Sequence, residues 1–330
     1  MTGRKSASAS WPFRRPGLPR CRTVSGPRST VWAMTERPRR LLITDLDNTL
    51  WDWFEAWYQS FSALVDALVN QSGVDRAVLE EQIRAVHRSR GTTEYSNLVR
   101  EVPALIDAAT PYDPAKVYDA ALHAQNSRRR AATCLYPGVG EGLRSLKQAG
   151  VRIAAYTESG AFWTEWRIKH TGLDGIIDVL YSSPDHDLTA GLKSSDLRSG
   201  HYEDEHYGLR GTQHLHVPHG VLKPNVEVLH SILDGQGCEP EESVYLGDSL
   251  MKDIVMAQAA GVLDAHAEYG LVQHRDEYDL LRRVTHWTDE DVAREKALAT
   301  PHGEVRPTVV CHNGFLDVLP LFGPALVGAR

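Results

Sequence analysis

The chain has 330 residues, of which 42% are hydrophobic and 24% charged, which is ordinary for a soluble globular protein of one large domain or two smaller ones. Residues 1–33 hold seven basic and no acidic side chains, and the rest of the chain carries 43 acidic against 29 basic residues. So acidic a body is not expected to bind nucleic acid. No apolar run approaches the ~20 residues of a transmembrane helix, so a membrane partner is not expected either.

The four cysteines lie far apart and form no CxxC pair, so we expect neither a disulfide framework nor a thiolate zinc site, and we expect a cytoplasmic location. Residues 1–38 are rich in Ser, Pro, Gly and Arg, which predicts a disordered basic extension. They lack the apolar region of a secretory signal, and their composition also suits an organelle transit peptide. We favour Met34 as the natural start; a basic arm for an anionic partner is a third interpretation.

The first expected strand, residues 41–44, ends in two carboxylates separated by one residue. In an extended backbone Asp45 and Asp47 point to the same side, and ligands bind beyond the strand ends of an open α/β sheet. Two such carboxylates repel each other unless a cation lies between them or one holds a proton, and an oxygen-rich site suits Mg²⁺. One Asp can then act as a nucleophile while the other transfers protons. The alternative is a plain polar turn at the end of a strand.

Residues 52–131 follow with helical periodicity and no convincing strand. Apolar residues recur at spacings of three and four between Trp57 and Val69, and further helices are expected at about 75–88, 95–109 and 114–131. This segment interrupts an α/β pattern, which predicts an inserted helical cap over the strand end. The aromatic residues at its beginning favour a packed hinge or core, with a substrate pocket as the alternative. They are Trp51, Trp53, Phe54, Trp57 and Tyr58.

Strands and helices alternate from residue 136 onward, which predicts a doubly wound parallel sheet built from residues 39–51 and 132–325. Strands are expected at 151–156, 176–181, 244–246, 262–265 and 308–311. The polar segment 184–220 breaks the alternation, and it contains His186, His201, His206, His214, His216 and His219. Because no pair of these has i, i+4 spacing and no cysteine is near, a solvated loop insertion is favoured over a structural metal site.

Polar residues stand at or next to the ends of four expected elements of this sheet. They are Asp45, Asp47, Thr157, Lys223, Asp248 and Asp253. The carboxyl ends of parallel strands share one edge, so these side chains can converge there. Reaction at a phosphoryl group needs positioning and charge neutralisation, for which the hydroxyl of Thr157 and the ammonium of Lys223 are suited. Asp248 can complete a Mg²⁺ shell that Asp45 begins.

This ordered set resembles the haloacid dehalogenase-like hydrolase superfamily, specifically its aspartyl-phosphate-forming phosphatases with a C1-type cap, such as phosphoglycolate phosphatase. The resemblance spans about residues 40–325 and rests on four motifs in order. They are Asp45-Leu46-Asp47-Asn48-Thr49-Leu50, Thr157, Lys223-Pro224 and Gly247-Asp248-Ser249-Leu250-Met251-Lys252-Asp253.

The resemblance implies a Rossmann-like α/β core, a helical cap at 52–131 and a Mg²⁺-dependent phosphatase of a small phosphorylated metabolite. Asp45 would attack phosphorus, and Asp47 would protonate the leaving oxygen and then deprotonate water. Mg²⁺ would be held by Asp45, the backbone carbonyl of Asp47 and Asp248, with Asp253 acting through water or orienting Lys223. Dehalogenase members lack the second Asp, so Asp47 favours phosphatase or phosphomutase chemistry.

Two alternatives share these motifs: a phosphomutase, and an idle module that binds a ligand or partner. The sequence leaves the oligomeric state open. One departure from the family pattern is Glu158, which follows Thr157 where Asn is commoner. Its charge either tunes specificity or cation binding near the phosphate site, or belongs to a turn residue that faces solvent.

Overall fold

The computed structural model describes residues 38–185, 208–218, 220–288, 290, 293, 305–323 and 326. The extension predicted to be disordered lies almost wholly outside these residues. So do four of the six histidines of the 184–220 segment: His186, His201, His206 and His219. The predictions made for them stay predictions.

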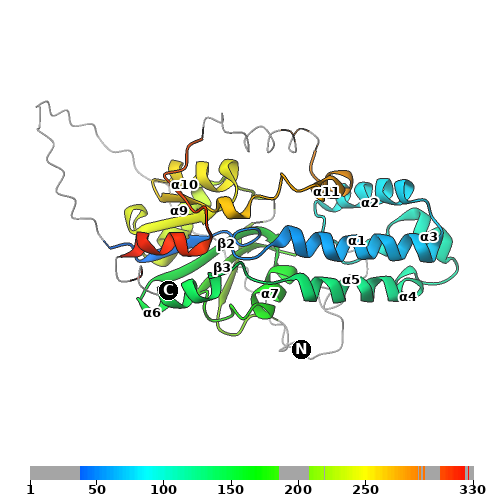
Figure 1. Cartoon of the computed structure of the whole chain (residues 1–330), viewed down its shortest axis with the longest axis horizontal. Helices are drawn as coiled ribbons and strands as arrows, with labels where there is room; N and C mark the ends of the chain where they lie inside the picture. The colour runs from blue at the N-terminus through cyan, green and yellow to red at the C-terminus, as the bar shows by residue number, and fades with distance from the viewer. Residues whose placement is uncertain are drawn as a thin grey trace, which may run out of the picture. The chain divides into compact units, whose positions relative to one another are not determined.

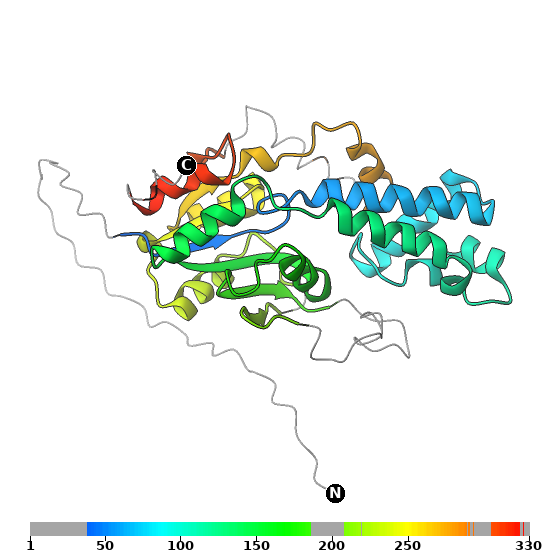
Figure 2. The same ribbon diagram turned by 60° about the horizontal axis from the view of Figure 1, so that its bottom comes forward.

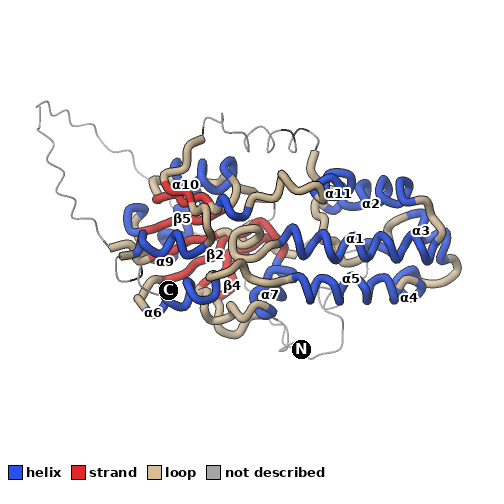
Figure 3. Tube along the Cα trace, in the orientation of Figure 1, coloured by secondary structure: helices blue, strands red, loops and turns tan. Residues whose placement is uncertain are grey.

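In the described part of the chain, seven strands form one parallel sheet in the order β4-β3-β2-β1-β5-β6-β7, which confirms the predicted fold class. Figure 3 shows the strands in red among the surrounding helices in blue. The strands are β1 (Leu41–Thr44), β2 (Arg152–Gly160), β3 (Val179–Ser183), β4 (Gln213–His216), β5 (Ser243–Gly247), β6 (Leu263–His266) and β7 (Val309–Val310). The chain winds outward from β1 through β4 and then returns to β5 on the other side of β1. The strand order therefore reverses between β1 and β5, which is where ligands bind in such sheets.

Helices cover both faces of the sheet, because β1 is buried on both sides and alternates its residues between them. Leu42 and Leu46 pack on one face with α6 (Val139–Gln148), α7 (Ala161–His170) and the 3₁₀ helix η6 (Phe315–Phe322). On the other face, Leu41 and Ile43 pack with residues of α9 and α10. These two helices span Val226–Gln236 and Val255–Ala259. The short helices η3 (Pro240–Glu242), η4 (Leu250–Ile254) and η5 (Glu268–Gly270) connect elements around β5 and β6.

The helical region between β1 and α6 has a hydrophobic core of its own, and Figures 1 and 2 show its helices grouped together beyond the sheet. It comprises α1 (Trp53–Ser72), α2 (Arg76–Arg90), η1 (Leu98–Arg100), α3 (Pro103–Ala109), α4 (Pro114–Val117) and α5 (Asp119–Ala132). The Asp52 side chain caps α1 by accepting from the Glu55 N–H, and Gly73 ends it in the left-handed conformation. None of the described helices is both long and apolar enough to cross a membrane.

A segment from the C-terminal half of the chain joins this second core. Helix α11 (Tyr278–Val284) contributes Tyr278, Leu281 and Val284 to the same cluster as α1 and α2. Arg283 pairs with Glu80 at 2.7 Å, so charged as well as apolar contacts hold α11 on α2. The helical region is therefore attached through its two connections to the sheet and also through α11.

The segment 184–220, predicted to be a loop, is partly a strand. β4 pairs in parallel with β3, and the preceding turn is fixed by Asp174, whose carboxylate accepts from the N–H groups of Arg210, Gly211 and Thr212. β4 is a mostly exposed edge strand, so it lacks the apolar run that reveals a buried one. The strand expected at 176–181 begins at Val179 instead, because Ile176 and Ile177 form a turn on the Leu173 carbonyl.

Candidate active site

Asp45 lies at the end of β1 with its side chain buried. Its N–H donates to the Leu246 carbonyl of β5 at 2.8 Å, which fixes the chain at the point where the strand order reverses. Asn48 then turns the backbone with a φ of 58°, and its side chain accepts from the N–H of Phe54 at the start of α1. The loop 45–51 is thereby connected to the sheet and to the helical region.

Lys223 joins the first and fourth motifs. Its ammonium is buried and lies 2.6 Å from Asp45 Oδ1 and 2.9 Å from Asp253 Oδ1. Asp253 also accepts from the Tyr245 hydroxyl at 2.9 Å and from the Ser249 N–H at 3.1 Å. Asp253 thus accepts from three protein donors, one of which is the Lys223 ammonium.

The backbone around β5 allows these carboxylates to approach one another. A π-helical turn, η4, follows Gly247 and brings Asp253 back toward the strand end. A Cβ on Gly247 would lie 2.3 Å from the Asp253 carboxyl carbon, so the position has no room for a side chain. Asp248 follows Gly247 in the chain, and the Asp248 carbonyl oxygen lies 3.0 Å from His266 Nε2.

Carboxylate oxygens of Asp45, Asp248 and Asp253 lie within 4.8 Å of one another. Burial, opposed by Lys223 and reinforced by Asp253, raises the pKa of Asp45 to about 7. Burial works against a charged Lys223, but Asp253 and Asp45 outweigh it and raise its pKa well above the ordinary value. One ammonium among several carboxylates leaves negative charge uncompensated, and hard oxygen donors suit Mg²⁺. The residues present therefore fit a magnesium ion.

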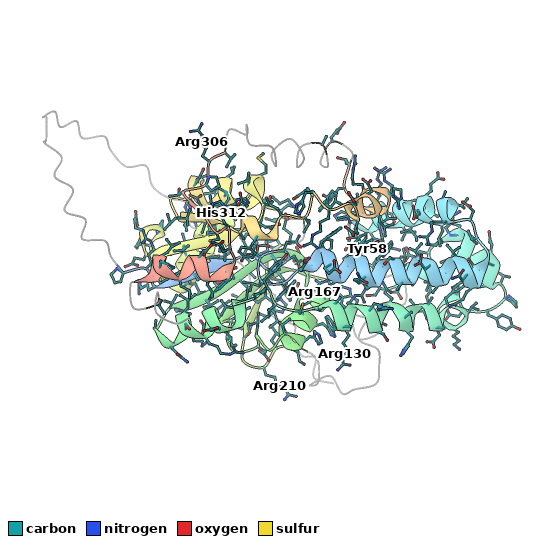
Figure 4. All side chains as sticks on the ribbon, in the orientation of Figure 1. Tyr58, Arg130, Arg167, Arg210, Arg306 and His312 are labelled. Atoms are coloured by element: carbon teal, nitrogen blue, oxygen red, sulfur yellow. The ribbon has the colours of Figure 1, made fainter. Side chains whose placement is uncertain are left out.

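Asp47 faces the helical region. Its Oδ1 accepts from the Trp51 indole N–H at 2.6 Å, and its Oδ2 accepts from the Ser159 hydroxyl. Arg167 of α7 forms an ion pair with Asp47, with Nη1 3.6 Å from Asp47 Oδ1. Figure 4 shows Arg167 between the sheet and helices α1 and α5. The carboxylate of Asp47 is thus held from two sides.

A family model described as haloacid dehalogenase-like hydrolase matches residues 42–189 and 215–266, which is more than half of the chain. The chain therefore belongs to the haloacid dehalogenase-like hydrolases. No curated protein sequence matches it significantly.

Solved structures of this family are similar to the chain. A 2-haloacid dehalogenase from Pseudomonas syringae pv. Tomato DC3000 is 21% identical with a TM-score of 0.45, covering 72% of this chain and 90% of that one. A predicted phosphoglycolate phosphatase from Haemophilus somnus 129pt is 18% identical with a TM-score of 0.40, covering 75% and 92%. A HAD phosphatase from Thermococcus onnurineus is 16% identical with a TM-score of 0.43, covering 74% and 96%. These values are low, so the family assignment rests on the family model.

In this haloacid dehalogenase-like hydrolase, Thr157 lies in β2 beside β1, where it is buried and accepts from the Ser159 N–H at 3.1 Å. The interpretation of Glu158 as a turn residue that faces solvent is wrong. Its carboxylate accepts from the Lys223 N–H and from the Lys252 ammonium, each at 2.7 Å. It therefore connects the second, third and fourth motifs of the family.

The sequence did not reveal three residues around Asp47. Ser159 follows Thr157 by two positions along β2, and that spacing was an available signal, because residues i and i+2 share a side of a strand. Arg167 and Glu94 come from α7 and from the loop between α2 and η1, and no sequence pattern predicts their meeting. In the aromatic cluster, Trp51, Phe54 and Trp57 are buried, as a packed hinge or core requires, whereas Trp53 and Tyr58 are partly buried and pack against the core of the helical region.

Proposed function

We propose that the chain is a Mg²⁺-dependent phosphatase that hydrolyses a small phosphorylated metabolite through a phosphorylated Asp45. The observation that supports this most is the meeting of Asp45, Asp47 and Lys223 at the reversal of the strand order. The site combines a nucleophile, a proton-transferring group and a cation. A halide leaving group needs no proton donor, so the carboxylate of Asp47 favours phosphoryl over halide chemistry.

Asp45 and Asp248, together with the backbone carbonyl of Asp47, would hold Mg²⁺. Bound there, the ion would neutralise charge on the phosphoryl oxygens and keep Asp45 ionised. Asp253 would support it indirectly, since its carboxylate is already engaged by Lys223, Tyr245 and Ser249.

An Asp45 oxygen attacks phosphorus while Asp47 gives a proton to the leaving oxygen, which forms the P–O bond to Asp45 and breaks the ester bond. Asp47, now ionised, then takes a proton from the water that attacks the phosphoryl group, and phosphate leaves with Asp45 regenerated. Lys223 and the Thr157 hydroxyl bind the non-bridging oxygens. The hydrogen bonds from Trp51 and Ser159 keep Asp47 in place through both steps.

The helical segment 52–131 would serve as the cap that selects the substrate, and residues 39–51 with 132–325 would form the catalytic core. Support comes from Glu94. Its carboxylate contacts both Trp53, the first residue of α1, and Arg167, and Arg167 in turn pairs with Asp47. A cap linked in this way to the proton-transferring residue would enclose a small substrate and exclude bulk water from it.

Phosphate release from p-nitrophenyl phosphate tests the proposal, with wild type and Asp45→Asn each assayed in Mg²⁺ and in EDTA. We expect activity that requires Mg²⁺ and is absent from Asp45→Asn. Activity that survives in Asp45→Asn would refute the mechanism. Product analysis with a sugar phosphate separates the phosphomutase alternative, because a mutase returns the phosphoryl group to the substrate as an isomer.

A further inference from the structure

A buried arginine links Asp47 to the helical region. The side chain of Arg167 is 2% exposed, and its Nη2 pairs with the carboxylate of Glu94 while its Nη1 lies 3.6 Å from Asp47. Its Nε and Nη1 have no hydrogen-bond acceptor among the described residues. A buried guanidinium with five N–H groups normally satisfies more of them. The carboxylates that act on Arg167 are those of Glu94 and Asp47.

Glu94 lies in a loop, but side chains from three other positions hold it in place. One carboxylate oxygen accepts from Arg167 and the other from the Trp53 indole at 3.1 Å, while its backbone carbonyl accepts from the Trp163 indole at 3.0 Å. Arg129 of α5 adds a further buried positive charge and lies over the Trp163 ring. Burial works against a charged Glu94, but Arg167 and Arg129 outweigh it and lower its pKa.

Glu94 belongs to the loop between α2 and η1, whereas Arg167 and Trp163 belong to α7, which follows the second motif. The contact therefore joins the helical region to the catalytic end of the sheet. The contacts of α11 with α2 also keep the helical region in place. If Glu94 were absent, Asp47 would be the remaining carboxylate acting on Arg167, and the guanidinium would move onto it.

We propose that Arg167 and Glu94 are positioning residues for Asp47. Glu94 keeps the guanidinium at the 3.6 Å distance from Asp47 and prevents it from forming a hydrogen-bonded pair, so that Asp47 can transfer protons while the loop 91–97 is docked on α7. Proton transfer by Asp47 therefore depends on the contact between Glu94 of the helical region and Arg167 of α7. This inference rests on the proposed phosphatase function, and its test includes an arm that does not need activity.

The variants are Glu94→Gln, Arg167→Met and the double variant, which removes both members of the Arg167–Glu94 pair together if either single variant folds poorly. Glu101→Gln is the matched control. It removes an equivalent carboxylate in the same region, paired with Arg90 at 2.7 Å, without touching Arg167. Wild type and variants are assayed for kcat/KM with p-nitrophenyl phosphate and with an alkyl phosphate.

An alkoxide leaves poorly without a proton, whereas p-nitrophenolate leaves as a stable anion, so the alkyl ester depends more on Asp47. We expect Glu94→Gln to lower kcat/KM for the alkyl ester by roughly 10- to 100-fold and to affect the aryl ester less. In the Arg167→Met background, Glu94→Gln should cause little further loss. Equal losses for the two esters, or no loss, would overturn the proposal.

The second arm follows the indole N–H resonance of Trp51, assigned with Trp51→Phe, because this group donates directly to Asp47. It should shift in Glu94→Gln and in Arg167→Met but not in Glu101→Gln. An unmoved Trp51 resonance in Glu94→Gln would overturn the proposal whether or not the protein is active. An inactive wild type whose Trp51 resonance responds as expected would instead refute the phosphatase function and leave the positioning contact supported.

Discussion

Replacing His87 with Asn should remove a pH dependence of stability that arises where α2 meets α11. His87 is buried, and its Nδ1 lies 2.7 Å from the Val284 carbonyl, an arrangement that needs a proton on Nδ1. Its Nε2 is also buried and has no hydrogen-bond partner among the described residues. A second proton would therefore place an uncompensated charge in the core. Burial accordingly lowers the pKa of His87 to about 4 from its ordinary 6.5.

The sign and size of the pH dependence follow from the difference between these two pKa values of His87. Between these two values the unfolded chain binds a proton at His87 that the folded chain does not, so acidification favours unfolding. The loss is about 1.4 kcal/mol for each pH unit below 6.5. The full difference corresponds to about 3 kcal/mol near pH 4, and about 2 kcal/mol at pH 5. Above pH 6.5 both states are neutral at this position, and the term vanishes.

Urea unfolding at pH 7.5, 6 and 5 measures this term as the difference between wild type and His87→Asn. Asn cannot titrate, and its amide nitrogen can take the place of Nδ1 toward Val284. The exposed His230 of α9 supplies the control, since His230→Asn makes the same substitution at a position outside the core. A wild type that loses no more stability than His87→Asn between pH 7.5 and 5 would show that burial does not keep His87 neutral.

Three further outcomes are expected. Lys223→Met should abolish activity and lower the free energy of unfolding in EDTA by about 3–5 kcal/mol, because it leaves the Asp45 and Asp253 carboxylates buried without their cation; an unchanged urea midpoint would contradict this. Asp248→Asn should remove the rise in Tm that Mg²⁺ gives the wild type, and an equal rise in both would exclude Asp248 as a ligand. Gly270→Ala should destabilise by about 1–3 kcal/mol and reduce activity, because its Cβ would lie 1.8 Å from the Asn48 carbonyl oxygen; wild-type urea unfolding of this variant would count against it.

The sequence was sufficient to predict most of the sheet, because buried parallel strands are short apolar runs separated by helical periods. β1 and β5 appeared where the runs 41–44 and 244–246 indicated. The fourth strand was missed because it is an exposed edge whose register comes from backbone contacts with β3 and with Asp174, not from an apolar pattern.

The same division applies to the site. Asp45 and Asp248 directly follow the neighbouring strands β1 and β5, so topology brings them together. Asp253 and Lys223 lie further beyond their strands, and the turn η4 and the segment after β4 return them to the site. Glu94 carries no such signal, since it lies in a loop whose position depends on how a separate hydrophobic core packs. Contacts between two packed bodies are set by side-chain complementarity, which periodicity does not encode.

Acid-quenched trapping of the reaction tests the central claim most directly. The protein is mixed with p-nitrophenyl phosphate and Mg²⁺, quenched within the first turnover, digested and analysed by peptide mass. We predict one phosphoryl group on the peptide that contains Asp45, and none when Asp45→Asn is treated in the same way. Phosphate released at the wild-type rate with no phosphoryl group ever found on Asp45 would contradict the account.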